Sequence, residues 1–285
     1  MRLTKLLAAP LFATSLFLTG CIGIDFDHGS SDKYQEDFHF SYDLQPNGQL
    51  VAETFNGKVE IIGWDENKVD ISGTKYGSTE RLRDSIKIDT HNSPSSVEVR
   101  AVHPSGSTGN SGARMTIKVP KQAVVGRVTS SNGAIRIEHV GAISHVKTSN
   151  ATIRITDASG DLDARTSNAQ IEVERFNGSL SARSSNGRIR AEGVTGKCDV
   201  ETSNASIDVR MDHATAAPIR LTTSNGAIEL ALDKAPKSDI HAQSSNGDRV
   251  KKDHLNGTLG NGGPAIDLET RNSSIRILKT TGTSN

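Results

Sequence analysis

Three acidic residues stand close together in the segment "DASGDLD", near the middle of the 285-residue chain. Asp157, Asp161 and Asp163 carry the kind of side chain that cleaves glycosidic bonds, a reaction that needs two carboxyl groups at a defined separation across a cleft. All three sit at one turn, and no equivalent partner group stands out elsewhere in the sequence. The sequence therefore predicts no catalytic residues, and we expect the protein not to be an enzyme.

Histidine side chains are a second source of chemistry. The chain contains nine of them, including His139 and His145. None shows the His-x-x-x-His spacing that places two imidazoles on one face of a helix for metal binding. We expect each to lie at the solvated surface, and the sequence predicts neither a metal site nor a cofactor.

The N-terminus predicts a covalent lipid anchor. Arg2 and Lys5 precede an apolar run that reaches Leu18, which is the order of a secretory signal. The segment closes on "LTGC", which resembles the bacterial lipobox. This resemblance implies cleavage before Cys21 and acylation of its thiol and new amino group, which makes residues 1–20 a lipoprotein signal peptide. A plain signal peptide followed by an accidental cysteine is the alternative.

Lipidation at Cys21 would place the protein in the cell envelope, with the membrane as a partner, because several acyl chains together anchor a protein stably. Ile22 is not the Asp that typically retains such proteins at the inner membrane, so the outer membrane is favoured if the organism has two. Removal of Arg2 and Lys5 leaves 31 basic and 33 acidic side chains. This balance provides no electrostatic attraction toward nucleic acid.

A nine-residue phrase recurs through the rest of the chain, as in "TSNATIRIT", "TSNAQIEVE" and "TSNASIDVR". Its asparagine returns every 18 residues, then every 21, and once more after a longer gap, at Asn132, Asn150, Asn168, Asn186, Asn204, Asn225, Asn246 and Asn272. A related phrase, "TFNGKVEII", begins at Thr54. In most copies Ile stands three residues after the Asn, but the Asn246 copy has Arg249 there.

This period predicts an all-β fold in which each repeat is one coil of a parallel β-solenoid. Alternation such as Ile153, Arg154, Ile155 has the period of a half-buried strand, and a second strand follows half a period later, as in "GDLDAR". Stacked coils of 18–21 residues would form two flattened sheets around a thin core. Cys198 shares the inward column of the second strand, so we expect an inert buried thiol.

The repeat also suggests the organisation of the chain. After the signal peptide we expect a tether at 21–37, irregular N-terminal β coils at 38–120, regular solenoid coils at 121–280 and a tail at 281–285. Terminal coils of solenoids commonly depart from the consensus because they must cap an open end.

We interpret the repeated Asn as architectural. Asn-Gly and Asn-Ala tolerate the left-handed backbone of a tight corner, and identical stacked corners allow Asn side chains to bond to one another as a ladder. A ligand-binding row of Asn is the alternative. The preceding hydroxyl residues, such as Thr148, Thr166 and Thr202, are expected to face the core.

Outward columns of charge lie beside the repeated phrase. Arg136 and Arg154 would stack on one face, and Lys147, Arg165 and Arg183 on the other. Such charges keep a flat sheet soluble and oppose lateral aggregation. The alternative is a basic strip that binds acidic glycans.

The segments "FNGKVEIIGWDENKVDISGT" and "MTIKVPKQAVVGRVTSSNGAIRIEHV" and the "TSNGxIxV" coils together resemble the bacterial putative-adhesin β-strand-repeat family, over about residues 45–280. The resemblance implies a β-solenoid at the cell envelope and no catalytic residues. The function expected from it is a non-enzymatic lipoprotein that serves as a scaffold or an adhesin-like binding surface, with envelope polysaccharide or protein as its partner. A β-helix protein that binds or cleaves polysaccharide is the alternative.

Overall fold

Alternating apolar and polar residues form strands along most of Ser31–Asn285, the second of the two units into which the chain divides; the first is Met1–Ser30. The computed structural model describes residues 32–103, 109–211, 217–232, 238–245, 255–259 and 262–279, with 255–259 and 279 in backbone only. The predicted signal peptide, Cys21, the tail and Asn246 lie outside the described residues.

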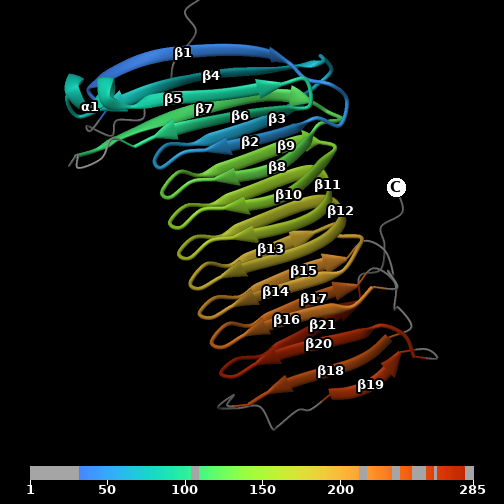
Figure 1. The fold of residues 1–285 in the computed structure, drawn as a ribbon. Coiled ribbons are helices and arrows are strands. Elements are labelled where there is room, and N and C mark those ends of the chain that lie inside the picture. Colours follow the sequence, from blue (N-terminus) through green and yellow to red (C-terminus); the bar gives the residue numbers. More distant parts are fainter. Residues whose placement is uncertain are drawn as a thin grey trace, which may run out of the picture. The chain divides into compact units, whose positions relative to one another are not determined.

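Parallel strands stack into the coils of a β-solenoid, as the repeat predicts (Figure 1). Each regular coil has two faces, which we name the isoleucine face and the second face. The isoleucine face contains, in spatial order, β7 (Ser111–Pro120), β3 (Val59–Trp64), β9 (Ile135–Val140), the first parts of β11 (Ile153–Arg165) and β12 (Ile171–Ser184), β13 (Ile189–Glu192), β15 (Ile207–Met211), β17 (Ile228–Leu232) and β21 (Ile275–Lys279).

The second face is built in the same way from the strands that follow half a period later. In spatial order it contains β6 (Ser96–Val102), β2 (Gln49–Glu53), β8 (Val124–Thr129), β10 (Ala142–Lys147), the last parts of β11 and β12, β14 (Cys198–Thr202), β16 (Ile219–Thr223), β20 (Ala265–Thr270) and β18 (Ser238–Ser244). Because β11 and β12 run through a corner without interruption, both faces belong to one continuous sheet.

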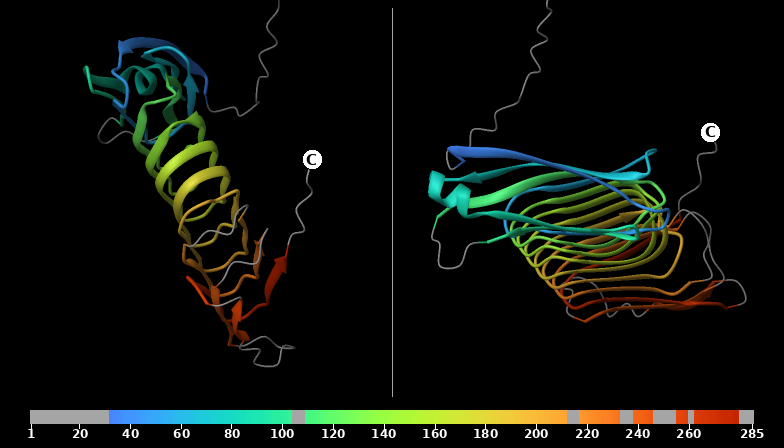
Figure 2. Two further views of the ribbon diagram at one scale, coloured as in Figure 1. Left: turned by 90° about the vertical axis from the view of Figure 1, so that its right-hand side faces the viewer. Right: turned by 45° about the horizontal axis from the view of Figure 1, so that its top comes forward.

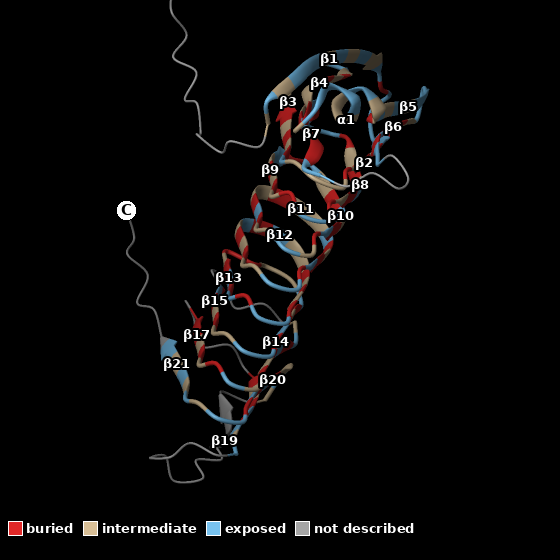
Figure 3. Ribbon diagram, turned by 90° about the vertical axis from the view of Figure 1, so that its left-hand side faces the viewer, coloured by how far each residue is buried: buried red, intermediate tan, exposed pale blue. Residues whose placement is uncertain are grey.

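Equivalent residues of successive coils lie side by side. Ile153 pairs with Ile171, and Leu162 with Leu180, 18 residues on in each case. Their side chains and those of their counterparts fill the interior between the two faces, where buried residues line every coil (Figure 3). Cys198 belongs to this core and is fully buried.

The N-terminal part differs from the expected irregular coils. Strands β1 (Tyr34–Asp43) and β4 (Lys68–Gly77) pair antiparallel with each other, and β4 also pairs antiparallel with β7. Helix α1 (Glu80–Ser85) follows β4, and β5 (Lys87–Ser93) forms a hairpin with β6 (Figure 2). These antiparallel elements form a cap on the first coil, and β1 begins inside the range predicted as tether.

Spatial order departs from chain order at both ends of the stack. The coil of β2 and β3 lies between the later β6 and β7 on one side and β8 and β9 on the other. At the C-terminal end, β20 lies between β16 and β18, although β18 and its antiparallel partner β19 (Leu255–Leu259) precede it in the chain. The outer layer is made after the coil it covers at the N-terminal end and before it at the C-terminal end, which a period count does not reveal.

Candidate functional site

The repeated asparagines form one hydrogen-bonded row along a corner of the solenoid. From Asn132 onward, each Nδ2 donates to the Oδ1 of the Asn before it in the row, with donor–acceptor distances of 2.6–2.8 Å. The row runs through Asn56, Asn132, Asn150, Asn168, Asn186, Asn204, Asn225 and Asn272. Asn56 comes from the related phrase at Thr54. Because Asn272 bonds directly to Asn225, the expected order with Asn246 between them is wrong.

The row is exposed, and its backbone differs from the expectation. From Asn132 to Asn272 its side chains are exposed, so the amide bonds lie at the surface. No Asn of the row has a positive φ among the residues that the structure describes. The left-handed corner is the opposite one, where His139, Asp157 and Arg175 have φ of 58°, 52° and 50°.

A buried row of hydroxyls lies beside the exposed amide row. Thr148, Thr202 and Thr270 are at most 2% exposed, and each donates to the carbonyl of a small residue on the neighbouring coil. Thr202, for example, donates to the carbonyl oxygen of Gly187 at 3.1 Å. The inward orientation expected for Thr148 and Thr202 thus gives the carbonyls of Gly133 and Gly187 a partner, which a buried acceptor requires.

Two of the three carboxylates first considered for catalysis, Asp157 and Asp163, lie in ion pairs. Arg175 donates to both oxygens of Asp157, at 2.5 and 2.9 Å, and His139 lies 3.4 Å from the same carboxylate. The hydrogen bonds from Arg175 lower the pKa of Asp157, and the nearby His139 acts in the same direction. A general acid in glycoside hydrolysis needs a raised pKa, so this carboxylate is poorly suited to that role. Asp163 is bonded to Arg165 at 2.9 Å.

The proposed basic strip is divided between the two faces, and its arginines have carboxylate partners. Arg136 bonds Glu138 at 2.7 Å, Arg154 bonds Glu172 at 2.6 Å, and Arg165 bonds Asp163. Arg183 lies 3.3 Å from Asp199 and 3.4 Å from Glu201. Among the described residues Lys147 has no ion pair. The strip therefore presents alternating charge.

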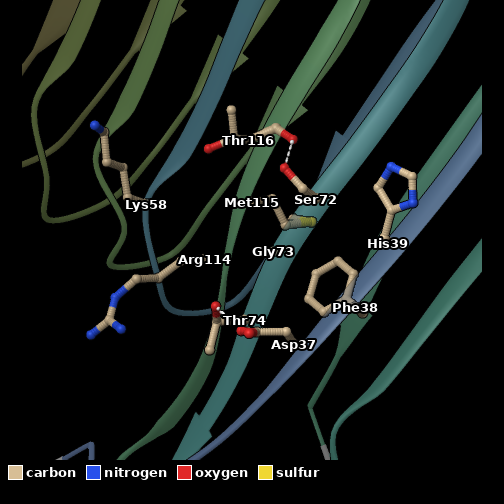
Figure 4. A pocket seen from close by; sticks show the side chains of 10 residues that line it. All are labelled: Asp37, Phe38, His39, Lys58, Ser72, Gly73, Thr74, Arg114, Met115 and Thr116. Carbon is tan, nitrogen blue, oxygen red and sulfur yellow. Dashed lines mark hydrogen bonds between the residues drawn. The ribbon is translucent and has the colours of Figure 1, made fainter. Parts of the chain in front are cut away.

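An open groove with a volume of about 640 Å³ lies on the cap, where β1, β4 and β7 adjoin Lys58 (Figure 4). Its lining residues are Asp37, Phe38, His39, Lys58, Ser72, Gly73, Thr74, Arg114, Met115 and Thr116. In the figure, Phe38 and His39 stand on one side of β4 and Lys58 and Arg114 on the other. No spacing in the sequence indicates this groove, because its residues come from segments that are distant in the chain.

The strand register aligns polar residues across this groove. Asp37 is opposite Thr74, Thr74 is opposite Arg114, and the backbone N–H of Met115 donates to the carbonyl of Lys58 at 2.9 Å. The row therefore runs anion, hydroxyl, cation, cation over adjacent strands.

Neither a membrane-spanning helix nor a group of three or more metal-ligating side chains occurs in the part of the chain that the structure describes. Cys198 is likewise unsuited to nucleophilic chemistry, because burial raises the pKa of its thiol to about 12.

The chain is similar to a known protein family and to solved structures. No curated protein matches the sequence. The structure of "a putative adhesin from Parabacteroides merdae" is 10% identical, with a TM-score of 0.36 over 86% of this chain and 97% of that one. That of "a putative cell adhesion protein from Clostridium sporogenes" is 12% identical, with a TM-score of 0.29 over 86% of this chain and 100% of that one. The model of a family described as Toastrack DUF4097 matches residues 49–278. The chain belongs to the Toastrack DUF4097 family.

Proposed function

We propose that the protein is a non-enzymatic scaffold of the cell envelope, held to a membrane by lipid at Cys21, that binds envelope polysaccharide or protein through its surface. The observation that supports this best is the unbroken stack of coils from β8 and β9 to β20 and β21. In-register pairing fixes the backbone of the paired strands, so the coils offer a rigid framework that loses little backbone freedom on binding.

Two features of the site favour binding over catalysis. The carboxylate at the left-handed corner, Asp157, is engaged by Arg175, and its pKa is lowered. The outward columns pair opposite charges between or within strands. Such surfaces fix the orientation of a partner more than they activate one.

The anchor is tested by Cys21→Ser in the full chain. We expect the variant to incorporate no radiolabelled fatty acid and to leave the membrane pellet, because its lipid attachment site is gone. Unchanged labelling together with unchanged sedimentation would refute the anchor.

The binding role is tested by incubating the purified full chain, in detergent, with isolated envelope polysaccharide and with solubilised envelope protein. We expect co-sedimentation or capture with at least one of the two and no release of new reducing ends. New reducing ends, lost when Asp157 and Asp163 are changed to Asn, would instead favour a polysaccharide-cleaving enzyme.

A further inference from the structure

The cap groove has the features of a ligand site. Its volume of about 640 Å³ lies within the range of about 300–1,000 Å³ that is typical of small-molecule sites. It belongs to the part of the chain that does not repeat, so its residues are not explained by the stacking of identical coils. The groove is hollow because Ser72, Gly73, Thr74 and Thr116 are small.

Gly73 determines how an aromatic ring borders this hollow. A Cβ at Gly73 would lie 2.4 Å from the ring of Phe38 and 2.3 Å from the carbonyl oxygen of Arg114. Its absence allows the Phe38 ring to lie across β4, half-buried against the core. The ring thus packs on the core-facing side of the strands that carry the polar row.

Hydrogen-bonding capacity remains in the polar row. Asp37 accepts from the Thr74 hydroxyl at 2.7 Å through Oδ1, while its Oδ2 and the hydroxyl of Thr116 have no hydrogen bond within the described part of the chain. Lys58 uses one N–H for Glu60, at 3.2 Å, and an ammonium has three. Asp37 and Arg114 lie two strand spacings apart, about 10 Å.

The charge of the lining is also informative. Lys58 and Arg114 stand on adjacent strands and Asp37 faces them across the groove, so the lining residues include two fixed positive charges and one negative. Arg114 is held in place by Asp32 and by the ring of Tyr76, which is 4.5 Å from the guanidinium carbon. A ligand with one carboxylate and several hydroxyls would complement this arrangement.

We propose that the cap groove binds a carboxylate-bearing sugar unit of an acidic polysaccharide, an inference that rests on the proposed binding function. The carboxylate of the sugar bonds Lys58 and Arg114, and its hydroxyls bond Asp37 and Thr116.

Calorimetric titration of the full chain in detergent tests the proposal, with short oligogalacturonate, short oligoglucuronate and a neutral galacto-oligosaccharide as probes. We expect at least one acidic probe to bind and the neutral one not to. Lys58→Gln should weaken that binding about tenfold, since a hydrogen bond to a charged group contributes enough for that factor. Asp37→Asn should weaken it several-fold.

Lys68→Gln is the matched control, because Lys68 is an exposed, ion-paired lysine of β4 that does not line the groove. The Lys68→Gln variant should bind the acidic probe with the same affinity as the unmodified chain. Binding of neither acidic probe, equal binding of the neutral probe, or equal affinities for Lys58→Gln and Lys68→Gln would each overturn the proposal. If the Lys58→Gln variant captures envelope polysaccharide as well as the unmodified chain does, the groove is not the binding site. The proposed binding function would still stand.

Discussion

The side-chain amide of Asn272 donates a hydrogen bond to the Oδ1 of Asn225 at 2.6 Å, across 47 residues of chain. Every regular step of the same row spans 18 or 21 residues. The longer step arises because β18 and β19 come earlier in the chain than β20 and β21, whereas in space β20 lies between β16 and β18, and β21 pairs with β17. This hydrogen bond thus shows that spatial order differs from chain order at the C-terminal end.

Asn168→Ala should lower the free energy of unfolding by about 1 kcal/mol. It removes amide bonds to Asn150 and Asn186, each with a net contribution of about 0.5–1.5 kcal/mol, but water replaces them because the row is exposed. Asn272→Ala, with one bonded neighbour in the described row, should cost less. Denaturant melts measure both, and equal, negligible changes would show that the row is not stabilising.

Thr202→Val should destabilise the protein more than Asn204→Ala on the same coil. Thr202 is 2% exposed and donates to the carbonyl of Gly187. Leaving the buried carbonyl oxygen of Gly187 without a donor costs about 1–3 kcal/mol. Asn204 is exposed, so water can replace its hydrogen bonds. Urea melts of the two variants give the order, and a larger loss for Asn204→Ala would contradict the assignment of the main stabilising role to the buried hydroxyls.

Cys198 should resist a bulky thiol reagent in the native protein and react once the chain is denatured, because it is fully buried. Its pKa is raised from 9.0 to about 12, so the unfolded chain loses this proton at lower pH than the folded one. Stability should therefore be unaffected by this thiol below pH 9 and should fall as pH rises from about 9 to 12. Cys198→Ala, measured by melts over the same pH range, should lack this part of the decline; an identical decline would contradict it.

Arg175→Gly should give a more stable protein than Arg175→Val, by about 1–2 kcal/mol, because a left-handed backbone costs that much with a side chain that carries a Cβ. Both variants lose the ion pair with Asp157. The difference between their stabilities therefore measures the cost of a Cβ at a backbone φ of 50°. Gly193 occupies the corresponding corner position of the next coil, with φ 71°. Thermal melts compare the two, and coincident curves would exclude strain at this corner.

The repeat predicted the coils well because a period of 18 residues, with side chains that alternate between core and solvent, leaves little choice of strand register. Ile153, Ile171 and Ile189 can share a core only if they stack in register. The same parity placed Thr148 and Thr202 inward. Parity does not give the exposure of the Asn row, however, because corner residues belong to neither face.

The cap and its groove were not predictable in this way. Asp37, Thr74 and Arg114 meet through antiparallel pairing of strands that are far apart in sequence, and the segment from Phe38 to Pro120 has no period from which the partners follow. The left-handed corner was missed for another reason. His139, Asp157 and Arg175 are three different residue types, so the position that repeats in backbone conformation does not repeat in sequence.

The return of β20 and β21 to a place inside β18 affects how the chain can assemble. Coils up to β17 can be added one after another as the chain leaves a ribosome or a translocation channel, each on an edge that is already formed. The edge of β17 must wait, because its neighbour β21 is made only after β18 and β19. Assembly from the N-terminus therefore pauses at β17 until almost the whole chain has emerged, and during that pause the edge of β17 is open to mispairing with another chain.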